Sequence, residues 1–67
     1  MSTYKIIGNE MSKNLLIKRR HQNITLAEMA TQVNITRDVL SQIERGRKQV
    51  VQARVYNSLS NWLQEDK

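Results

Sequence analysis

The chain of 67 residues carries a net charge of +5, is 39% hydrophobic and contains neither cysteine nor proline. Such a length supports only one hydrophobic core, and the lack of cysteine excludes disulfides and thiolate metal sites. The longest apolar run, Leu15 to Ile17, is far shorter than the ~20 residues of a membrane span or the h-region of a signal peptide. We therefore expect one cytoplasmic domain, residues 1–67, without a membrane segment, metal or cofactor.

The composition favours helices over a β-rich fold, because proline and phenylalanine are absent and Leu, Ile, Val, Gln and Arg are abundant. Apolar spacing and start signals predict four helical segments with no long linker between them. The predicted fold is therefore all-α, a compact bundle of four to five helices. Residues 1–8 do not fit a helix and are compatible with a short strand, an extended arm or a flap on the bundle.

The first and last predicted helices each carry one apolar stripe. The first spans Asn9 or Ser12 to His21, with Ser12 as a plausible N-cap. The last spans Val51 to Gln64 and would close the core. Its stripe consists of Val51, Val55, Leu59, Trp62 and Leu63.

The two middle helices have the clearest start signals in the chain. Thr25 and Glu28 form a T-x-x-E capping box before the second helix, and Thr36 is the expected N-cap of the third. Only Asn34 and its neighbours separate the two helices, and a turn this short needs a residue that tolerates positive φ, as asparagine does. Two short helices joined in this way must cross at a large angle, as in a helix-turn-helix.

The helix from about Thr36 to Arg45 has one polar face, which lies opposite Leu40 and Ile43. This face collects Arg37, Asp38, Ser41, Gln42 and Arg45. Such side chains match base edges in the major groove, since Arg bonds bidentately to guanine, Gln bonds to adenine, Asp accepts from cytosine and Ser is permissive. A solvated helix face explains the same pattern, and periodicity alone favours that interpretation.

The flanking charges favour nucleic acid as the partner. Arg45, Arg47 and Lys48 follow the polar face, and the basic residues 18–20 close the first helix, so phosphate contacts can bracket a groove. The capped helix starts add backbone donors and positive dipole ends, which brings Thr25 into the phosphate-contacting set. A requirement for solubility alone explains the charges about equally well.

Four short motifs occur together between Leu16 and Arg47. They are an arginine near the end of the first helix, the T-x-x-E-M-A block from Thr25, the Ile35–Thr36 pair that begins the third helix, and the ending S-Q-I-E-R-G-R. Together they resemble the Cro/C1-type (XRE) helix-turn-helix family of phage, plasmid and bacterial regulators. The resemblance implies a lambda-repressor-like DNA-binding domain. It also implies that the chain acts on double-stranded DNA, and a small Cro-like repressor is the specific expectation.

The resemblance also implies roles for individual residues. Base contacts are implied on and beside the third helix for Thr36, Arg37, Asp38, Ser41 and Gln42. Phosphate contacts are implied for Arg45, Arg47 and Lys48. Arg19 and Glu44 match a partly buried ion pair that joins the first and third helices in this family, which gives both residues a structural role.

Three departures from the family pattern limit the comparison. Leu26 stands where the family usually has a glutamine that binds phosphate, Asn34 stands where glycine is common, and one long helix follows Gly46 where many members have two. Leu26 gives weight to a rival class, an antitoxin-like or anti-repressor-like protein-interaction module on the same fold. An enzyme is not expected, since His21 has no partner at a useful spacing, and no small-molecule ligand is indicated.

A homodimer is expected on DNA, because two recognition helices on a symmetric dimer read half-sites about one turn apart. The surface that joins the subunits does not follow from the resemblance. Tyr56 and Trp62 are candidates near the C-terminal end, where Leu63 is favoured as core and Trp62 fits either role. Ser2 to Ile7 is the other candidate, as an intersubunit strand or a DNA-contacting arm.

Overall fold

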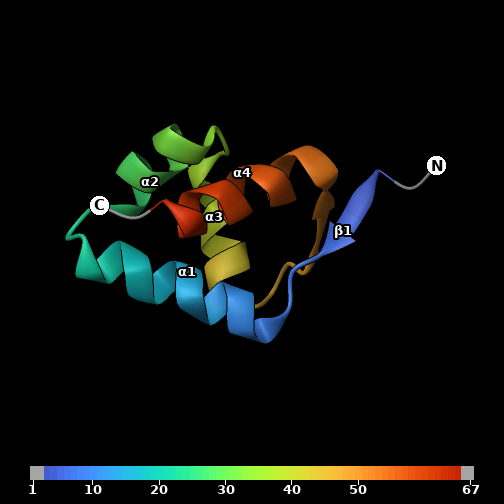
Figure 1. Ribbon diagram of the computed structural model, residues 1–67, viewed down its shortest axis with the longest axis horizontal. Coiled ribbons are helices and arrows are strands. Elements are labelled where there is room, and N and C mark those ends of the chain that lie inside the picture. The colour runs from blue at the N-terminus through green and yellow to red at the C-terminus, as the bar shows by residue number, and fades with distance from the viewer. Residues whose placement is uncertain (1–2, 66–67) are drawn as a thin grey trace.

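The computed structural model describes residues 3–65, in which four helices surround one core and two short strands form a ribbon at one end (Figure 1). The elements in chain order are β1 (Tyr4–Ile6), α1 (Asn9–His21), α2 (Leu26–Val33), α3 (Arg37–Glu44), β2 (Val50–Gln52) and α4 (Ala53–Gln64). No helix in this part of the chain is long and apolar enough to cross a membrane.

The all-α prediction is wrong in one respect, because β1 and β2 pair as an antiparallel ribbon in which Lys5 lies opposite Val51. Of the three interpretations of residues 1–8, the short strand is therefore correct for β1. The pairing also moves the start of the last helix from Val51 to Ala53. Each strand has only three residues, which is too short for an alternating pattern to predict it.

The helix starts follow the predicted chemistry with one exception. The Thr25 hydroxyl accepts from the Glu28 amide at 3.1 Å, and the Glu28 carboxylate accepts from the Thr25 amide at 3.0 Å, which completes the capping box. The Thr36 hydroxyl accepts an amide in the first turn of α3 at 3.4 Å. Ser12 is not an N-cap, because α1 begins at Asn9 and Ser12 is buried within the helix.

The turn between α2 and α3 has the predicted left-handed residue. Asn34 adopts φ 58° and ψ 47°, and the amide of Ile35 donates to the carbonyl of Ala30 at 3.0 Å. This hydrogen bond closes α2 and turns the chain directly into α3. Gly46 ends α3 with φ 74°, a conformation that an L side chain rarely adopts.

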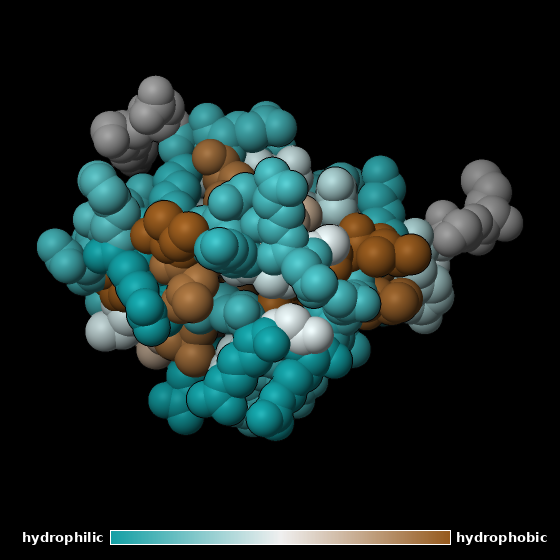
Figure 2. Space-filling model, turned by 90° about the horizontal axis from the view of Figure 1, so that it is seen from below, coloured by the Kyte–Doolittle hydropathy of each residue, from teal (hydrophilic) through white to brown (hydrophobic). Residues whose placement is uncertain are grey.

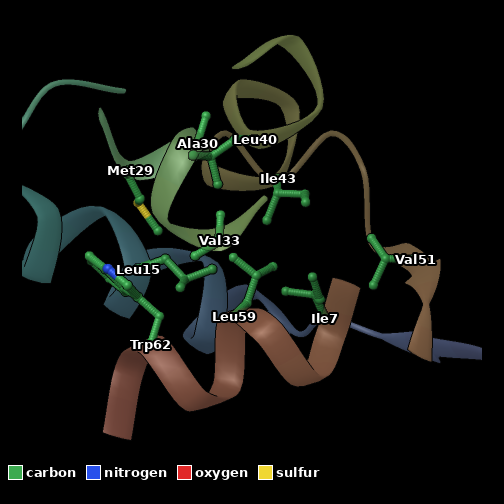
Figure 3. Close-up of a cluster of buried hydrophobic side chains, with 10 residues drawn as sticks. All are labelled: Ile7, Leu15, Met29, Ala30, Val33, Leu40, Ile43, Val51, Leu59 and Trp62. Atoms are coloured by element: carbon green, nitrogen blue, oxygen red, sulfur yellow. The ribbon is translucent and has the colours of Figure 1, made fainter. Parts of the chain in front are cut away.

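The core lies between the four helices, and the side chains of Leu15, Val33 and Leu59 point toward one another within it (Figure 3). The buried hydrophobic residues are Ile7, Leu15, Met29, Ala30, Val33, Leu40, Ile43, Val51, Leu59 and Trp62. Trp62 is therefore part of the core, and it is not available as a dimer contact. Its indole Nε1 donates to Gln32 Oε1 at 2.8 Å, which satisfies the polar atom of a ring that is only 5% exposed.

Candidate nucleic-acid interface

The face of α3 that points away from the core is polar. Leu40 and Ile43 are fully buried, which fixes the rotation of the short helix about its own axis. Arg37, Asp38 and Gln42 are consequently exposed, while Ser41 is half-buried on the same side.

A groove of about 410 Å³ runs between the start of α2 and the exposed face of α3. It is lined by Thr25, Leu26, Ala27, Arg37, Asp38 and Ser41. A second hollow of about 520 Å³ lies over the turn between the two helices, where Asn34, Thr36 and Arg37 contribute to its lining. Arg37 borders both hollows. The structure thus brings the predicted phosphate contact Thr25 and the predicted base contacts Arg37 and Asp38 onto one continuous surface.

The start of α2 offers hydrogen-bond donors to this groove. The capping box occupies the amides of Thr25 and Glu28 and leaves those of Leu26 and Ala27 for an outside acceptor. The Thr25 hydroxyl is engaged within the box, where it accepts from the Glu28 amide. Backbone donors at the capped helix starts are predicted from the sequence, and the structure identifies the amides of Leu26 and Ala27 as those that the box leaves unoccupied.

Glu28 places a negative charge at the same helix start. Two hydrogen bonds with Thr25 hold the pKa of the Glu28 carboxyl below its ordinary value. The bond from the Thr25 backbone amide has the larger effect, and the bond with the Thr25 side chain has the smaller one. The carboxylate is therefore ionised at neutral pH, and it offsets part of the positive dipole end of α2.

Arg19 and Glu44 form a bidentate ion pair between α1 and α3. The Arg19 Nε lies 2.8 Å from Glu44 Oε2, and Arg19 Nη2 lies 3.2 Å from Glu44 Oε1. A third donor, Arg19 Nη1, bonds the carbonyl of Ile24 in the turn after α1 at 3.2 Å. Because the two side chains are only 17% and 6% exposed, they fix α3 on the bundle and do not face an outside ligand.

The loop after α3 carries three basic side chains beside the polar face. The backbone amides of Arg47 and Lys48 both donate to the carbonyl of Gln42, at 2.9 and 3.2 Å. These bonds hold the loop against the last turn of α3. Arg45 and Arg47 are exposed and Lys48 is half-buried, so positive charge lies next to the exposed Gln42 side chain.

Two of the three basic residues at the end of α1, Lys18 and Arg19, are engaged within the bundle. Lys18 Nζ donates to the carbonyls of Trp62, Leu63 and Glu65 at the end of α4 and lies 4.9 Å from the centre of the Trp62 ring. α4 has no basic residue in its own last turn, and Lys18 supplies the cation that its dipole favours. With Arg19 paired as well, Arg20 is the exposed cation of the run.

Leu26 lies where the family pattern has a phosphate-binding glutamine. Its side chain is half-buried and packs against the hydrophobic core while it also lines the groove. A leucine side chain donates no hydrogen bond, so any phosphate contact at this position must come from the backbone amide.

A family model described as a helix-turn-helix domain matches residues 17–66, which include α2, α3 and α4. The chain belongs to this helix-turn-helix family, which is related to the Cro/C1 (XRE) type. DNA binding is the activity that this membership implies. Comparisons with curated proteins and with solved structures gave no match.

Proposed function

We propose that the protein is a sequence-specific transcriptional regulator that binds double-stranded DNA and reads the major groove with α3. The exposed polar face of α3 carries this proposal. An α-helix with its side chains is about 10–12 Å across, and the major groove, about 12 Å wide, admits such a helix. The start of α2 and the basic loop after α3 flank this helix, so donors for phosphate oxygens lie on both sides of it.

The proposed base contacts follow from the exposed side chains. Arg37 is suited to guanine, Gln42 to adenine and Asp38 to the amino group of cytosine. Ser41 and Thr36 add hydroxyl groups, and the Thr36 hydroxyl keeps its proton for donation because it only accepts at the helix start.

The proposed phosphate contacts lie at the two ends of the reading surface. Thr25 and the amides of Leu26 and Ala27 act at the start of α2. The cations Arg45, Arg47 and Lys48 act after α3. These contacts hold the helix in register along the groove and carry no base preference of their own.

We further propose that the protein acts as a small Cro-like repressor, as a homodimer on two half-sites. The reading surface supports regulation of transcription through DNA binding, since a bound protein blocks polymerase at an overlapping promoter. Leu26 was the reason to consider a protein-interaction module instead. Its packing against the core accounts for a leucine at this position without a protein partner, so we favour DNA.

Selection of bound duplexes from a random pool, followed by sequencing, tests this function. We expect enrichment of two related half-sites spaced by about one helical turn, since a symmetric dimer reads a symmetric site. The variant Arg37→Ala/Gln42→Ala should fail to enrich this sequence, whereas Gln64→Ala, an exposed change on α4, should enrich it unchanged. If the wild-type protein enriches no sequence, the proposal of specific DNA recognition is wrong.

A further inference from the structure

The outer face of the β1–β2 ribbon is apolar and exposed. Large hydrophobic side chains are exposed at four positions in the described part of the chain, and three of them belong to the ribbon. Tyr4 is 57% exposed, Ile6 71% and Val50 54%. Because Ile6 lies opposite Val50 and Tyr4 opposite Gln52, these four side chains share one face of the ribbon. Figure 2 shows hydrophobic side chains gathered at this end of the molecule.

This outer face carries no charge, although the protein as a whole is strongly basic. Lys5 is the charged residue of the two strands, and it belongs to the opposite face with the buried Val51. Its Nζ lies 5.2 Å from the centre of the Tyr56 ring, on α4. Two copies, each with a net charge of +5, repel each other in most orientations. At the outer face of the ribbon they can meet without bringing like charges together.

The ribbon also has the right position for a contact between two DNA-bound copies. It lies at one end of the long axis of the molecule, and α3 lies near the middle (Figure 1). The long axis measures 37 Å. Two copies that meet at their ribbon ends across a twofold axis therefore place their α3 helices about one molecular length apart. This separation is close to the ~34 Å between successive major grooves on one side of B-DNA.

We propose that two copies of this protein contact each other through the outer face of the ribbon, formed by Tyr4, Ile6, Val50 and Gln52. The inference rests on the proposed function, and it names the surface that makes DNA binding cooperative. Three large side chains cover much less than the ~800 Å² per partner of a stable interface. The contact is therefore weak in free solution and becomes effective when neighbouring half-sites hold two copies side by side.

Cysteine crosslinking tests the contact without DNA. The chain contains no cysteine, so Ile6→Cys, Val50→Cys and Tyr4→Cys each introduce a single thiol at the face. Ile17→Cys is the matched control, because Ile17 is a 52% exposed isoleucine on α1, outside the ribbon. At high protein concentration under mild oxidation, we expect at least one ribbon variant to form disulfide-linked dimers about tenfold faster than the control. Equal rates for all four variants would overturn the proposal.

Binding to duplexes with one or two selected half-sites tests the consequence on DNA. For the wild-type protein we expect occupancy of one half-site to tighten binding at the second by about tenfold. Ile6→Glu should keep its affinity for a single half-site and lose this gain, while Ile17→Glu should keep both. Thermal melting checks that the exposed substitutions leave the fold intact.

Cooperative binding that survives in Ile6→Glu would also overturn the proposed contact. A wild-type protein that binds no duplex would instead refute the proposed function. In that case the crosslinking experiment still decides whether the ribbon face joins two copies.

Discussion

Gln42 combines two separable roles in one residue. Its backbone carbonyl accepts the amides of Arg47 and Lys48 and so holds the basic loop, while its side chain is exposed on the polar face of α3. Substitution by alanine removes the side chain and leaves the carbonyl in place. The loop geometry should therefore survive a change that removes the proposed contact with adenine.

We predict that Gln42→Ala weakens binding to the selected site by about 1–3 kcal/mol and leaves binding to random duplex nearly unchanged. Parallel titrations of the two duplexes measure the difference, with Gln64→Ala as the control. Equal losses on both duplexes would contradict a base contact at Gln42.

The ion pair of Arg19 with Glu44 determines how firmly α3 is held. Glu44→Ala leaves the Arg19 guanidinium, in a side chain that is 17% exposed, without its carboxylate. We predict a loss of about 3–5 kcal/mol in the free energy of unfolding, as for other buried pairs broken on one side. Chemical denaturation measures this loss. The exposed Glu10→Ala should change stability by less than about 1 kcal/mol, and an unchanged melting temperature for Glu44→Ala would refute the structural role.

The start of α2 makes stability depend on pH. The folded-state pKa of Glu28 lies below its ordinary value because of the hydrogen bonds with Thr25. The ionised carboxylate therefore stabilises the protein above about pH 4.3, the ordinary pKa of glutamate, and this contribution is lost as the pH falls through the folded-state pKa. We predict that Glu28→Gln, which retains an acceptor oxygen for the box, loses less stability than the wild type on acidification.

Melting temperatures between about pH 6 and pH 3 measure this difference. Glu10→Gln is the control, since Glu10 is also an exposed glutamate in the first turn of a helix. If Glu28→Gln and the wild type show the same dependence on pH, the capping box does not contribute to acid stability.

The elements that the sequence predicts well are those whose chemistry is local. The capping box defines the start of α2, and left-handed Asn34 defines its end, within a few residues of chain. The polar face of α3 follows from the spacing of Leu40 and Ile43 in the same way. Such features need no knowledge of distant residues, and so the helix-turn-helix and its exposed face are predictable.

The features that the sequence does not predict depend on partners far along the chain. β1 forms because β2 lies beside it. Lys18 does not belong to the exposed basic surface, because it binds carbonyls at the end of α4. Ser12 has the residue type of an N-cap but lies inside α1, which begins after Gly8 without a side-chain cap. The groove likewise emerges only when α2 and α3 are packed together.

The molecule as a whole joins a rigid reading unit to a small ribbon. The pair of Arg19 with Glu44 fixes α3 to α1, and Lys18 fixes the end of α4 to α1. These long-range contacts leave the polar face of α3 and the loop after it exposed at one surface. The affinity for DNA should therefore come from electrostatic contacts with phosphates, and the sequence preference should come from α3.

The affinity for duplex DNA as a function of salt concentration tests this arrangement. Each phosphate neutralised on B-DNA contributes a slope of about −0.9 to log affinity against log salt, so Arg45, Arg47 and Lys48 together predict a slope of about −2.7 per copy. Lys48→Ala should make the slope shallower by about 1 on every sequence. A linear decline of this size would support DNA as the ligand of this surface. An affinity that does not change with salt, or no binding of duplex at low salt, would contradict it.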